Sequence, residues 1–480
     1  MSATPSTKIF EKFIPLWSAW WDIVKQLRPA FSRNSTFLWF AAALAAICVR
    51  PDLRGVTSFV RALGLRQRCY WRFLDFFHSS AVKLPALRAL WADIVLALLK
   101  PFLFIVNGRI VLLADGIKAP KTGRKMPGVK KLHQESQNNS KPEYIFGHSC
   151  QAIAVVVHAA ASFLAVPLAT VIHEGVVFSN RDKRTLLDKL ILLLGSLLIT
   201  MPAYLVADRY YASAKVILPL LKQAQHLITA VRSNAVAYMP APPVEMRGRG
   251  RPKKYGDKIK IKELFKNLGL FVSAPSPVYG ERGVNILYRT IDLYWRPVGR
   301  LVRFVCVIHP TRGCMTFLST DLSLDALEVV RCYGVRFKIE VTFKQAVHTV
   351  GTWCYHFWMA DMDPRPNRSG NQHVHHKSER YRAHVRRKLA AYDCHLQVGA
   401  IAQGLLQMLA ILHAGTVWQR FGSWLRTIRP GIAPSEGVVT LALRQCLPEF
   451  LATNRETNIL AKLITENLDL DRAEGWRLAS

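Results

Sequence analysis

The feature that most constrains this chain is the alternation of apolar runs with amphipathic segments between residues 109 and 236. Short apolar or β-branched runs predict strands, and apolar residues recurring every three or four positions predict helices. Strands are expected at residues 109–115, 144–159, 162–173, 204–207 and 226–236, and helices at residues 180–198 and 212–225. The order is therefore three strands, a helix, a strand, a helix and a strand.

A closing helix, predicted at residues 325–350, follows only after a long interruption. The interruption holds a proline-rich and densely basic linker, and then three strand candidates at residues 285–295, 300–308 and 314–319. With the closing helix added, the order is that of ribonuclease-H-like cores. The sequence thus predicts an α/β fold: a ribonuclease-H-like mixed-sheet core with an inserted small β region, flanked by helical N- and C-terminal regions.

The charge of the chain is strongly positive. Its 480 residues include 65 Lys and Arg but only 32 Asp and Glu, which gives a formal net charge of +33. Clustered cations release counterions from a phosphate backbone, so the composition favours a polyanionic partner. An acidic membrane surface would select the same sign of charge and stays open as an alternative.

Two apolar stretches, at residues 152–172 and 190–207, resemble membrane spans. Pro167 interrupts the first and Pro202 the second, so buried strands and a buried helix are the favoured interpretation. The nine cysteines include no Cys-x-x-Cys pair, which argues against a zinc ribbon and fits a reducing cytosol. The first residues lack a basic head followed by an apolar stretch, so we expect no signal peptide and a cytoplasmic location.

Three acidic residues stand where this topology would bring them together. Asp115 is predicted to end the first core strand, Asp208 ends the fourth strand beside it, and Glu340 lies on the closing helix. Hard divalent ions prefer oxygen ligands, and a pair of such ions can stabilise both the attacking and the leaving oxygen of a displacement at phosphorus. Each acid alone has an ordinary alternative, as a helix cap or on a solvated helix face. The prediction therefore rests on the three together.

The pattern Tyr333-x2-Arg336-x3-Glu340 resembles the signature of one large group of bacterial insertion-sequence transposases. The segments 113–118, 125–128 and 206–211 are similar to that group's first and second acidic blocks, so the resemblance covers roughly residues 105–355. It implies a DDE-type transposase in which Asp115, Asp208 and Glu340 hold Mg²⁺, with Mn²⁺ as a substitute. Such an enzyme cleaves DNA at the transposon ends and transfers the freed strand to target DNA.

The resemblance also implies that Tyr333 and Arg336 contact the phosphate backbone near the cleaved end, where a guanidinium fork matches phosphate oxygens. Two ends must be joined, so the expected partners are double-stranded terminal inverted repeats, target DNA and a second copy of the chain. The expected setting is the nucleoid of a bacterial cell, with no membrane partner.

One position departs from the pattern. The family usually has a lysine seven residues after the glutamate, and this chain has Val347 there. Lys344, four residues after Glu340, is the candidate substitute for contact with DNA. If it does not substitute, phosphate contact and strand positioning are weakened, and a slow or decayed enzyme is expected. The alternative functions are a catalytically decayed DNA-binding protein and a basic membrane protein.

Two further regions suggest contact with DNA. Arg249 and Arg251, followed by Lys253 and Lys254, resemble an AT-hook, in which arginines enter the minor groove of A·T-rich DNA; a solvated linker is the alternative. Helices predicted at residues 56–63 and 70–77 resemble a helix-turn-helix with a basic second member, or an ordinary hairpin.

Other signals have more ordinary interpretations. The basic helix predicted at residues 377–388 is a DNA-facing stripe or a solvated face. The histidines at 373, 375 and 376 could bind metal but stand in a loop-like context. The aromatic residues between positions 353 and 358 could stack on a flipped base, although core packing is favoured.

These segments divide the chain into five regions. Residues 1–106 form a helical N-terminal DNA-binding region, and residues 107–240 form the first part of the core. Residues 241–322 are the basic linker and inserted β region, and residues 323–360 the closing helix region. Residues 361–480 form a helical C-terminal region for DNA contact or dimerisation.

Overall fold

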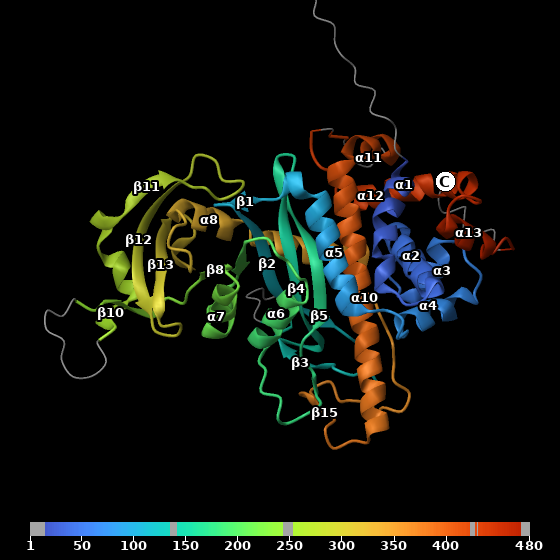
Figure 1. Ribbon diagram of the computed structural model, residues 1–480, viewed down its shortest axis with the longest axis horizontal. Coiled ribbons are helices and arrows are strands. Elements are labelled where there is room, and N and C mark those ends of the chain that lie inside the picture. The colour runs from blue at the N-terminus through green and yellow to red at the C-terminus, as the bar shows by residue number, and fades with distance from the viewer. Residues whose placement is uncertain (1–14, 135–141, 243–252, 423–427, 430, 472–480) are drawn as a thin grey trace, which may run out of the picture.

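One mixed sheet of thirteen strands runs through the described part of the chain, with helices packed against it (Figure 1). The computed structural model describes residues 15–134, 142–242, 253–422, 428–429 and 431–471. The predicted core strands lie side by side in this sheet, and the inserted strands continue it.

The five core strands have the order β5–β4–β2–β7–β8. They span Ser162–Ile172 (β5), Tyr144–Ala159 (β4), Arg109–Pro120 (β2), Ala203–Ala207 (β7) and His226–Ala230 (β8). β4 is antiparallel to β5 and β2, whereas β2, β7 and β8 run parallel to one another. This is the ribonuclease-H-like arrangement, so the predicted fold class is confirmed. Two short strands, β1 (Ile105–Val106) and β3 (Lys130–His133), pair with β2 and β4.

The two helices between core strands are shorter than predicted because polar residues fix where they begin. α6 (Leu186–Gly195) starts after Thr185, whose backbone N–H donates to the Asp188 carboxylate at 2.7 Å. α7 (Ala214–Lys222) starts after Ser213, whose hydroxyl accepts from the Lys215 backbone N–H. Each bond satisfies an N–H that the first helical turn leaves without a partner.

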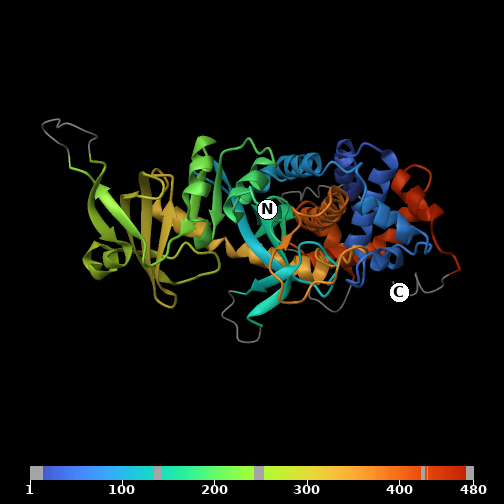
Figure 2. The ribbon, with the colours of Figure 1, turned by 90° about the horizontal axis from the view of Figure 1, so that it is seen from below.

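The inserted region extends the core sheet. The three predicted strands are confirmed as β12 (Asn285–Trp295), β13 (Arg300–His309) and β14 (Gly313–Ser319). β14 pairs antiparallel with β8, and this pairing joins insertion and core edge to edge (Figure 2). The prediction of a single strand at 226–236 is wrong. β8 ends at Ala230, and a separate strand that begins at Val236 pairs with the inserted strands. The outer strands are β9 (Val236–Pro240), β10 (Tyr255–Lys260) and β11 (Val272–Pro275), with 3₁₀ turns at Ile261–Lys266 and Leu268–Leu270.

Helices from both ends of the chain pack into one helical body (Figure 1). The Trp17 indole N–H donates to the Leu443 carbonyl at 2.9 Å, and the Arg66 backbone N–H donates to the Asn467 carbonyl at 2.9 Å. The N-terminal helices are α1 (Leu16–Val24), α2 (Asn34–Val49), α3 (Val56–Ala62), α4 (Cys69–Phe77) and α5 (Leu84–Leu98), with 3₁₀ turns at Lys25–Ala30 and Lys100–Phe102. The C-terminal helices are α10 (Glu379–Leu412), α11 (Ala414–Phe421), α12 (Glu436–Thr453) and α13 (Ile459–Glu466).

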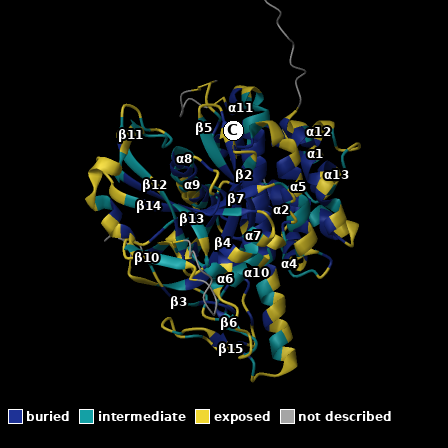
Figure 3. Cartoon of the chain, turned by 60° about the vertical axis from the view of Figure 1, so that its left-hand side comes forward, coloured by how far each residue is buried: buried dark blue, intermediate teal, exposed yellow. Residues whose placement is uncertain are grey.

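The long helix α10 changes character along its length. Its first turns are basic and largely exposed, and its second half is apolar and buried against β5 and α2 (Figure 3). Within the described residues, α10 alone has the length and composition of a membrane span, but 89% of its apolar window is buried inside the protein. The two stretches that resembled membrane spans are instead β4 with β5, and α6 with β7.

The predicted closing helix is divided into two. α8 (Ala326–Gly334) and α9 (Phe337–Gln345) are separated by a turn at residues 335–336, and a π turn at Ala346–Val350 follows α9. The Asp325 carboxylate accepts the backbone N–H of Leu327 and so begins α8. A small parallel pair, β6 (Val176–Val177) with β15 (Gln372–His373), lies outside the main sheet.

The contact between α10 and α5 generates a stability prediction. A Cβ added at Gly404 would lie 2.4 Å from Cζ2 of Trp91, and the indole N–H of Trp91 is bonded to the Pro167 carbonyl at 2.9 Å. Gly404→Ala should therefore destabilise the protein by about 1–3 kcal/mol through overpacking. Thermal unfolding followed by circular dichroism measures this.

The matched control is Gly437→Ala in α12, where a Cβ would meet nothing within 4 Å. It should leave the melting temperature unchanged or raise it, because alanine favours a helix by up to about 1 kcal/mol over glycine. Equal melting temperatures for the two variants would contradict the packing argument.

Candidate active site

The parallel pairing of β2 with β7 brings two of the three predicted acids together. The pairs run from Ile110↔Ala203 to Ala114↔Ala207, so Asp115 and Asp208 are the next residue on each strand. β7 ends there, but β2 continues to Pro120 because its other edge stays paired with β4. The prediction that Asp115 ends its strand is therefore wrong: Asp115 stands within β2, at the point where one neighbouring strand stops.

Local hydrogen bonds orient these two aspartates. The Asp115 carboxylate accepts the Gly116 backbone N–H at 2.8 Å. Asp208 caps the 3₁₀ turn Arg209–Tyr211, since its Oδ1 accepts the Tyr210 backbone N–H at 2.9 Å. The capping role that an aspartate after a strand often has is thus real, and it fixes the carboxylate at the end of β7.

Arg336 joins the third acid to the first. Its Nη1 lies 2.9 Å from Oδ2 of Asp115, and its Nη2 lies 2.8 Å from Oε1 of Glu340. The guanidinium therefore bridges a strand of the core and helix α9. Asp115 and Arg336 are largely buried, whereas the Glu340 side chain is 56% exposed. A buried guanidinium held by two carboxylates is a strong, directional interaction.

The three acids share one electrostatic environment. Burial raises the pKa of Asp115 to about 6; Arg336 and the Gly116 N–H oppose this shift, and the negative charges of Asp208 and Glu340 add to it. Burial alone would lower the pKa of Arg336, but Asp115, Tyr333 and Glu340 raise it. The site thus concentrates negative charge, with one cation among the acids.

The Tyr333–Arg336–Glu340 pattern spans the short turn between α8 and α9. The guanidinium carbon of Arg336 lies 5.8 Å from the centre of the Tyr333 ring, which itself packs against Phe317 at 4.7 Å. Despite the divided helix, Arg336 therefore contacts both other members of the pattern. Lys344 is exposed on α9, and Val347 is exposed in the π turn.

Two uncharged side chains beneath the acids were missed from the sequence. Burial raises the pKa of Tyr211, and Asp115 and Asp208 add to that shift. Its hydroxyl accepts the Gln151 side-chain amide at 3.4 Å, and Gln151 stands opposite Gly116 in the β2–β4 pair. A tyrosine three residues after the aspartate that follows β7 was the available signal for Tyr211. No sequence signal pointed to Gln151, because a single amide side chain within a strand matches no functional motif.

The donor set fits a hard divalent cation, although the acids are not gathered into one cluster. Among the described residues, no three His, Cys, Asp or Glu side chains lie close enough together to hold a metal ion. Asp115 and Asp208 offer carboxylate oxygens from adjacent strand positions, and the guanidinium stands between Asp115 and Glu340. The metal-binding alternative for residues 373–376 is not supported, and His375 instead bonds to Asn180 at 2.9 Å.

The loop that contains the Lys125–Gly128 block is a structural anchor. Met126 is buried, the Pro127 carbonyl lies 2.9 Å from Nε2 of His148, and the Lys125 carbonyl accepts the Met359 backbone N–H. These contacts tie the loop after β2 to β4 and to the segment that follows α9. The block therefore fixes the path of this loop, and these contacts are made away from the three acids.

The remaining predicted residues lie away from the acids or outside the described chain. Arg249 and Arg251 are among the residues that the structure does not describe, and Lys253 and Lys254 are exposed just before β10. Trp353, Tyr355 and Phe357 are buried, which supports core packing over base stacking, and Trp358 is exposed. Tyr355 packs against Tyr392 of α10 at 4.9 Å.

Comparison with known proteins adds family evidence to this geometry. A family model described as DDE superfamily endonuclease matches residues 26–268, just over half of the chain. The chain belongs to the DDE endonuclease superfamily. The matched segment includes Asp115 and Asp208 and also the helices from α2 to α5. The match ends before Glu340, so the evidence that Glu340 belongs to the site is its ion pair with Arg336.

One solved structure of a transposase is similar to this chain, but only distantly. The cryo-EM structure of a piggyBac transposase synaptic complex with hairpin DNA shares 11% identity at a TM-score of 0.36, covering 96% of this chain and 86% of that one. A search of curated proteins gives no match.

The bridge made by Arg336 generates a pH-dependent prediction. In Arg336→Gln the charges of Asp115 and Glu340 lose their compensation, at a cost of about 1–3 kcal/mol at pH 8. The folded-state pKa of Asp115, about 6, exceeds its ordinary value of 3.8. Protonation of Asp115 therefore stabilises the folded state at acidic pH, and this stabilisation is lost as the pH rises through 6. At pH 5 the cost should shrink, because Asp115 is then largely protonated.

Thermal unfolding of the variant at pH 5 and pH 8 tests this. Arg331→Gln is the control, since Arg331 pairs with Glu328 at 3.0 Å on the neighbouring α8. The control should lose little stability at either pH. A loss for Arg336→Gln that is the same at both pH values would refute the bridging role.

Proposed function

We propose that this chain is a metal-dependent DNA transposase that binds transposon ends, cleaves DNA there and joins the freed strand to target DNA. The observation that supports it most is the arrangement of the acids in a ribonuclease-H-like core: Asp115 and Asp208 follow paired positions of adjacent strands, and Arg336 links Asp115 to Glu340. Membership of the DDE endonuclease superfamily and the net charge of +33 point to the same substrate.

In this proposal Asp115, Asp208 and Glu340 would hold Mg²⁺, with Mn²⁺ as a substitute. The ions would supply a more acidic water and charge stabilisation at phosphorus. Arg336 would release the carboxylates and donate its fork to a backbone phosphate near the cleaved end, beside Tyr333. Burial around Asp115 excludes water, which strengthens each of these charge interactions.

The order of bond changes follows from the substrate. Water attacks the phosphorus at the transposon end, the P–O3′ bond breaks, and the freed 3′-oxygen takes up a proton. That 3′-hydroxyl then attacks a phosphorus of target DNA, and the target's own 3′-oxygen leaves. Joining two ends calls for two copies of the chain on the DNA, working in the nucleoid of a bacterial cytoplasm.

The test uses DNA that carries the inverted repeats flanking the gene, purified protein and Mg²⁺ or Mn²⁺. Asp115→Asn, Asp208→Asn and Glu340→Gln should each lower cleavage by roughly 10³-fold or more, about 4 kcal/mol of transition-state stabilisation, and leave DNA binding intact. Matched controls are Asp182→Asn and Glu328→Gln, whose acids pair with Arg184 and Arg331 outside the site. Binding without cleavage by the unmodified protein would favour a decayed DNA-binding protein.

A second experiment concerns the position usually occupied by lysine. Lys344 and Val347 are both exposed beyond Glu340, so a lysine at either position could present a cation to DNA bound at the site. Lys344→Ala should weaken binding of the cleaved end about tenfold, and adding Val347→Lys should restore it. Removal of one phosphate contact should also make the salt dependence of binding shallower by about one unit. Unchanged binding of the cleaved end by Lys344→Ala would show that Lys344 does not take the place of the family's usual lysine.

A further inference from the structure

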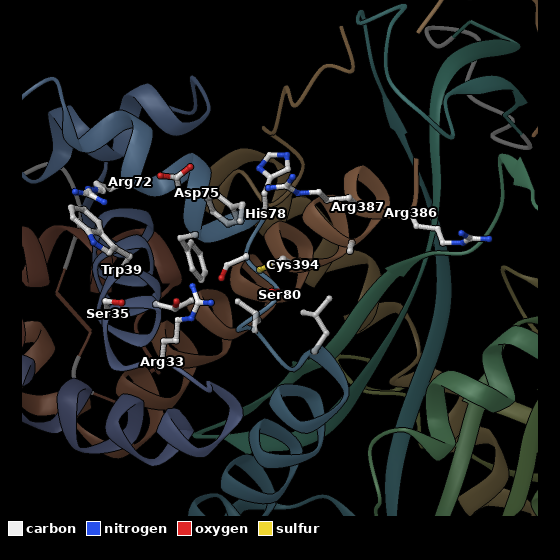
Figure 4. A pocket seen from close by; sticks show the side chains of 17 residues that line it. Arg33, Ser35, Trp39, Arg72, Asp75, His78, Ser80, Arg386, Arg387 and Cys394 are labelled. Carbon is white, nitrogen blue, oxygen red and sulfur yellow. The ribbon is translucent and has the colours of Figure 1, made fainter. Parts of the chain in front are cut away.

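A groove of about 890 Å³ opens in the helical body, away from the three acids. Its walls are the start of α2, the helix α4 with the residues that lead into α5, and the basic first half of α10 (Figure 4). None of its lining residues comes from the core strands. The groove is therefore a second concave feature, built by segments far apart in the sequence.

Three of the four arginines that line the groove have no ion-pair partner among the described residues. Arg33 just before α2, Arg72 from α4 and Arg387 from α10 are exposed, and no ion pair of theirs occurs among the described residues. In Figure 4, Arg33 and Arg72 lie on one side of the groove and Arg387 with His78 on the other. Arg386 is different, because it pairs with Glu379 at 2.6 Å. The only acid on the lining is Asp75.

Further positive charge surrounds these three arginines. Lys388 lies 3.0 Å from Nε2 of His78, and the charges of Lys388 and Arg387 help to lower the pKa of His78, which burial lowers first. The N-terminal ends of α2 and α5 also border the groove, and helix N-termini carry partial positive charge. Like charges held in one concavity repel one another, and a bound anion would relieve that repulsion.

We propose that this groove binds the phosphodiester backbone of duplex DNA, as a contact site separate from the site of cleavage. The inference rests on the proposed function and adds to it where DNA is held away from the acids. The guanidinium forks of Arg33, Arg72 and Arg387 match phosphate oxygens, and the hydroxyls of Ser35 and Ser80 on the same lining can donate to them. Contacts of this kind position DNA and carry no base sequence.

The groove also joins two basic segments that the sequence presents separately. Arg68 just before α4 and Arg72 within it are exposed, and the first turns of α10 carry Arg386 and Arg387. Apolar residues of both helices are buried, so each helix keeps its position while its arginines face solvent. The groove is thereby a rigid surface, which lowers the ordering cost of binding a stiff duplex.

The experiment measures DNA binding in EDTA, where no cleavage occurs, on a transposon-end duplex and a scrambled duplex of equal length. The groove variant changes Arg33, Arg72 and Arg387 to Gln. It should bind both duplexes at least tenfold more weakly, and the slope of log affinity against log salt should be shallower by about two to three units.

The control variant changes Arg61, Arg420 and Arg455 to Gln. These arginines are exposed outside the groove and each pairs with an acid, at 2.7, 3.1 and 3.9 Å. The control removes the same total charge, so equal loss of affinity in the two triple variants would overturn the proposal. Loss of binding to vesicles of anionic phospholipid with unchanged affinity for DNA would overturn it as well.

A second variant tests the groove without removing any side chain that the fold uses. Ala390→Glu places a carboxylate on the exposed α10 wall and should weaken DNA binding in the same direction. Unaltered DNA binding in this variant, with the fold intact by circular dichroism, would contradict the assignment. The two proposals can fail separately. If the groove variants bind DNA more weakly but the unmodified protein does not cleave repeat ends with Mg²⁺, the groove is supported as a DNA-binding site and the proposed transposase function is contradicted.

Discussion

The parallel pairing of β2 with β7 is the contact on which the rest of the site depends. Five residue pairs align the strands, and the pairing stops one residue before each aspartate. Because β2 continues along β4 while β7 ends, Asp115 stays fixed within a sheet and Asp208 begins a turn. A shift of one residue in this register would turn Asp115 to the opposite face of the sheet, where it could not reach Arg336.

Arg336 has a corresponding role for the elements outside that pair. It stands at the start of α9, after a chain that has left the core at β8, crossed six inserted strands and returned. Its two ion pairs attach that returning segment to β2. The insertion is itself fixed to the core by the pairing of β14 with β8. The position of Glu340 on α9 therefore depends both on this pairing and on the ion pairs of Arg336.

Much of this architecture follows from local sequence patterns, and the remainder depends on contacts that no local pattern encodes. Alternating residues in β12 to β14 and the apolar run before Asp208 predict strands well, because each pattern is set by burial of one or both faces. The end of β2 was misplaced because the apolar run of the sequence stops at Asp115, whereas pairing with β4 keeps the strand in the sheet as far as Pro120. Tyr211 and Gln151, and the meeting of α4 with α10, come from tertiary packing alone.

The packing of both chain ends into one helical body has a consequence for how the protein is made. Twelve of the sixteen residues of α2 are buried, in large part by α10, α12 and α13. During synthesis α2 emerges well before α10, α12 and α13, so its apolar surface stays uncovered until these helices have followed. Such a chain depends on delayed collapse or on a chaperone until then. The wall of the groove that α10 supplies is also made after the walls from α2, α4 and the start of α5, so a chain whose synthesis stops before α10 lacks that surface.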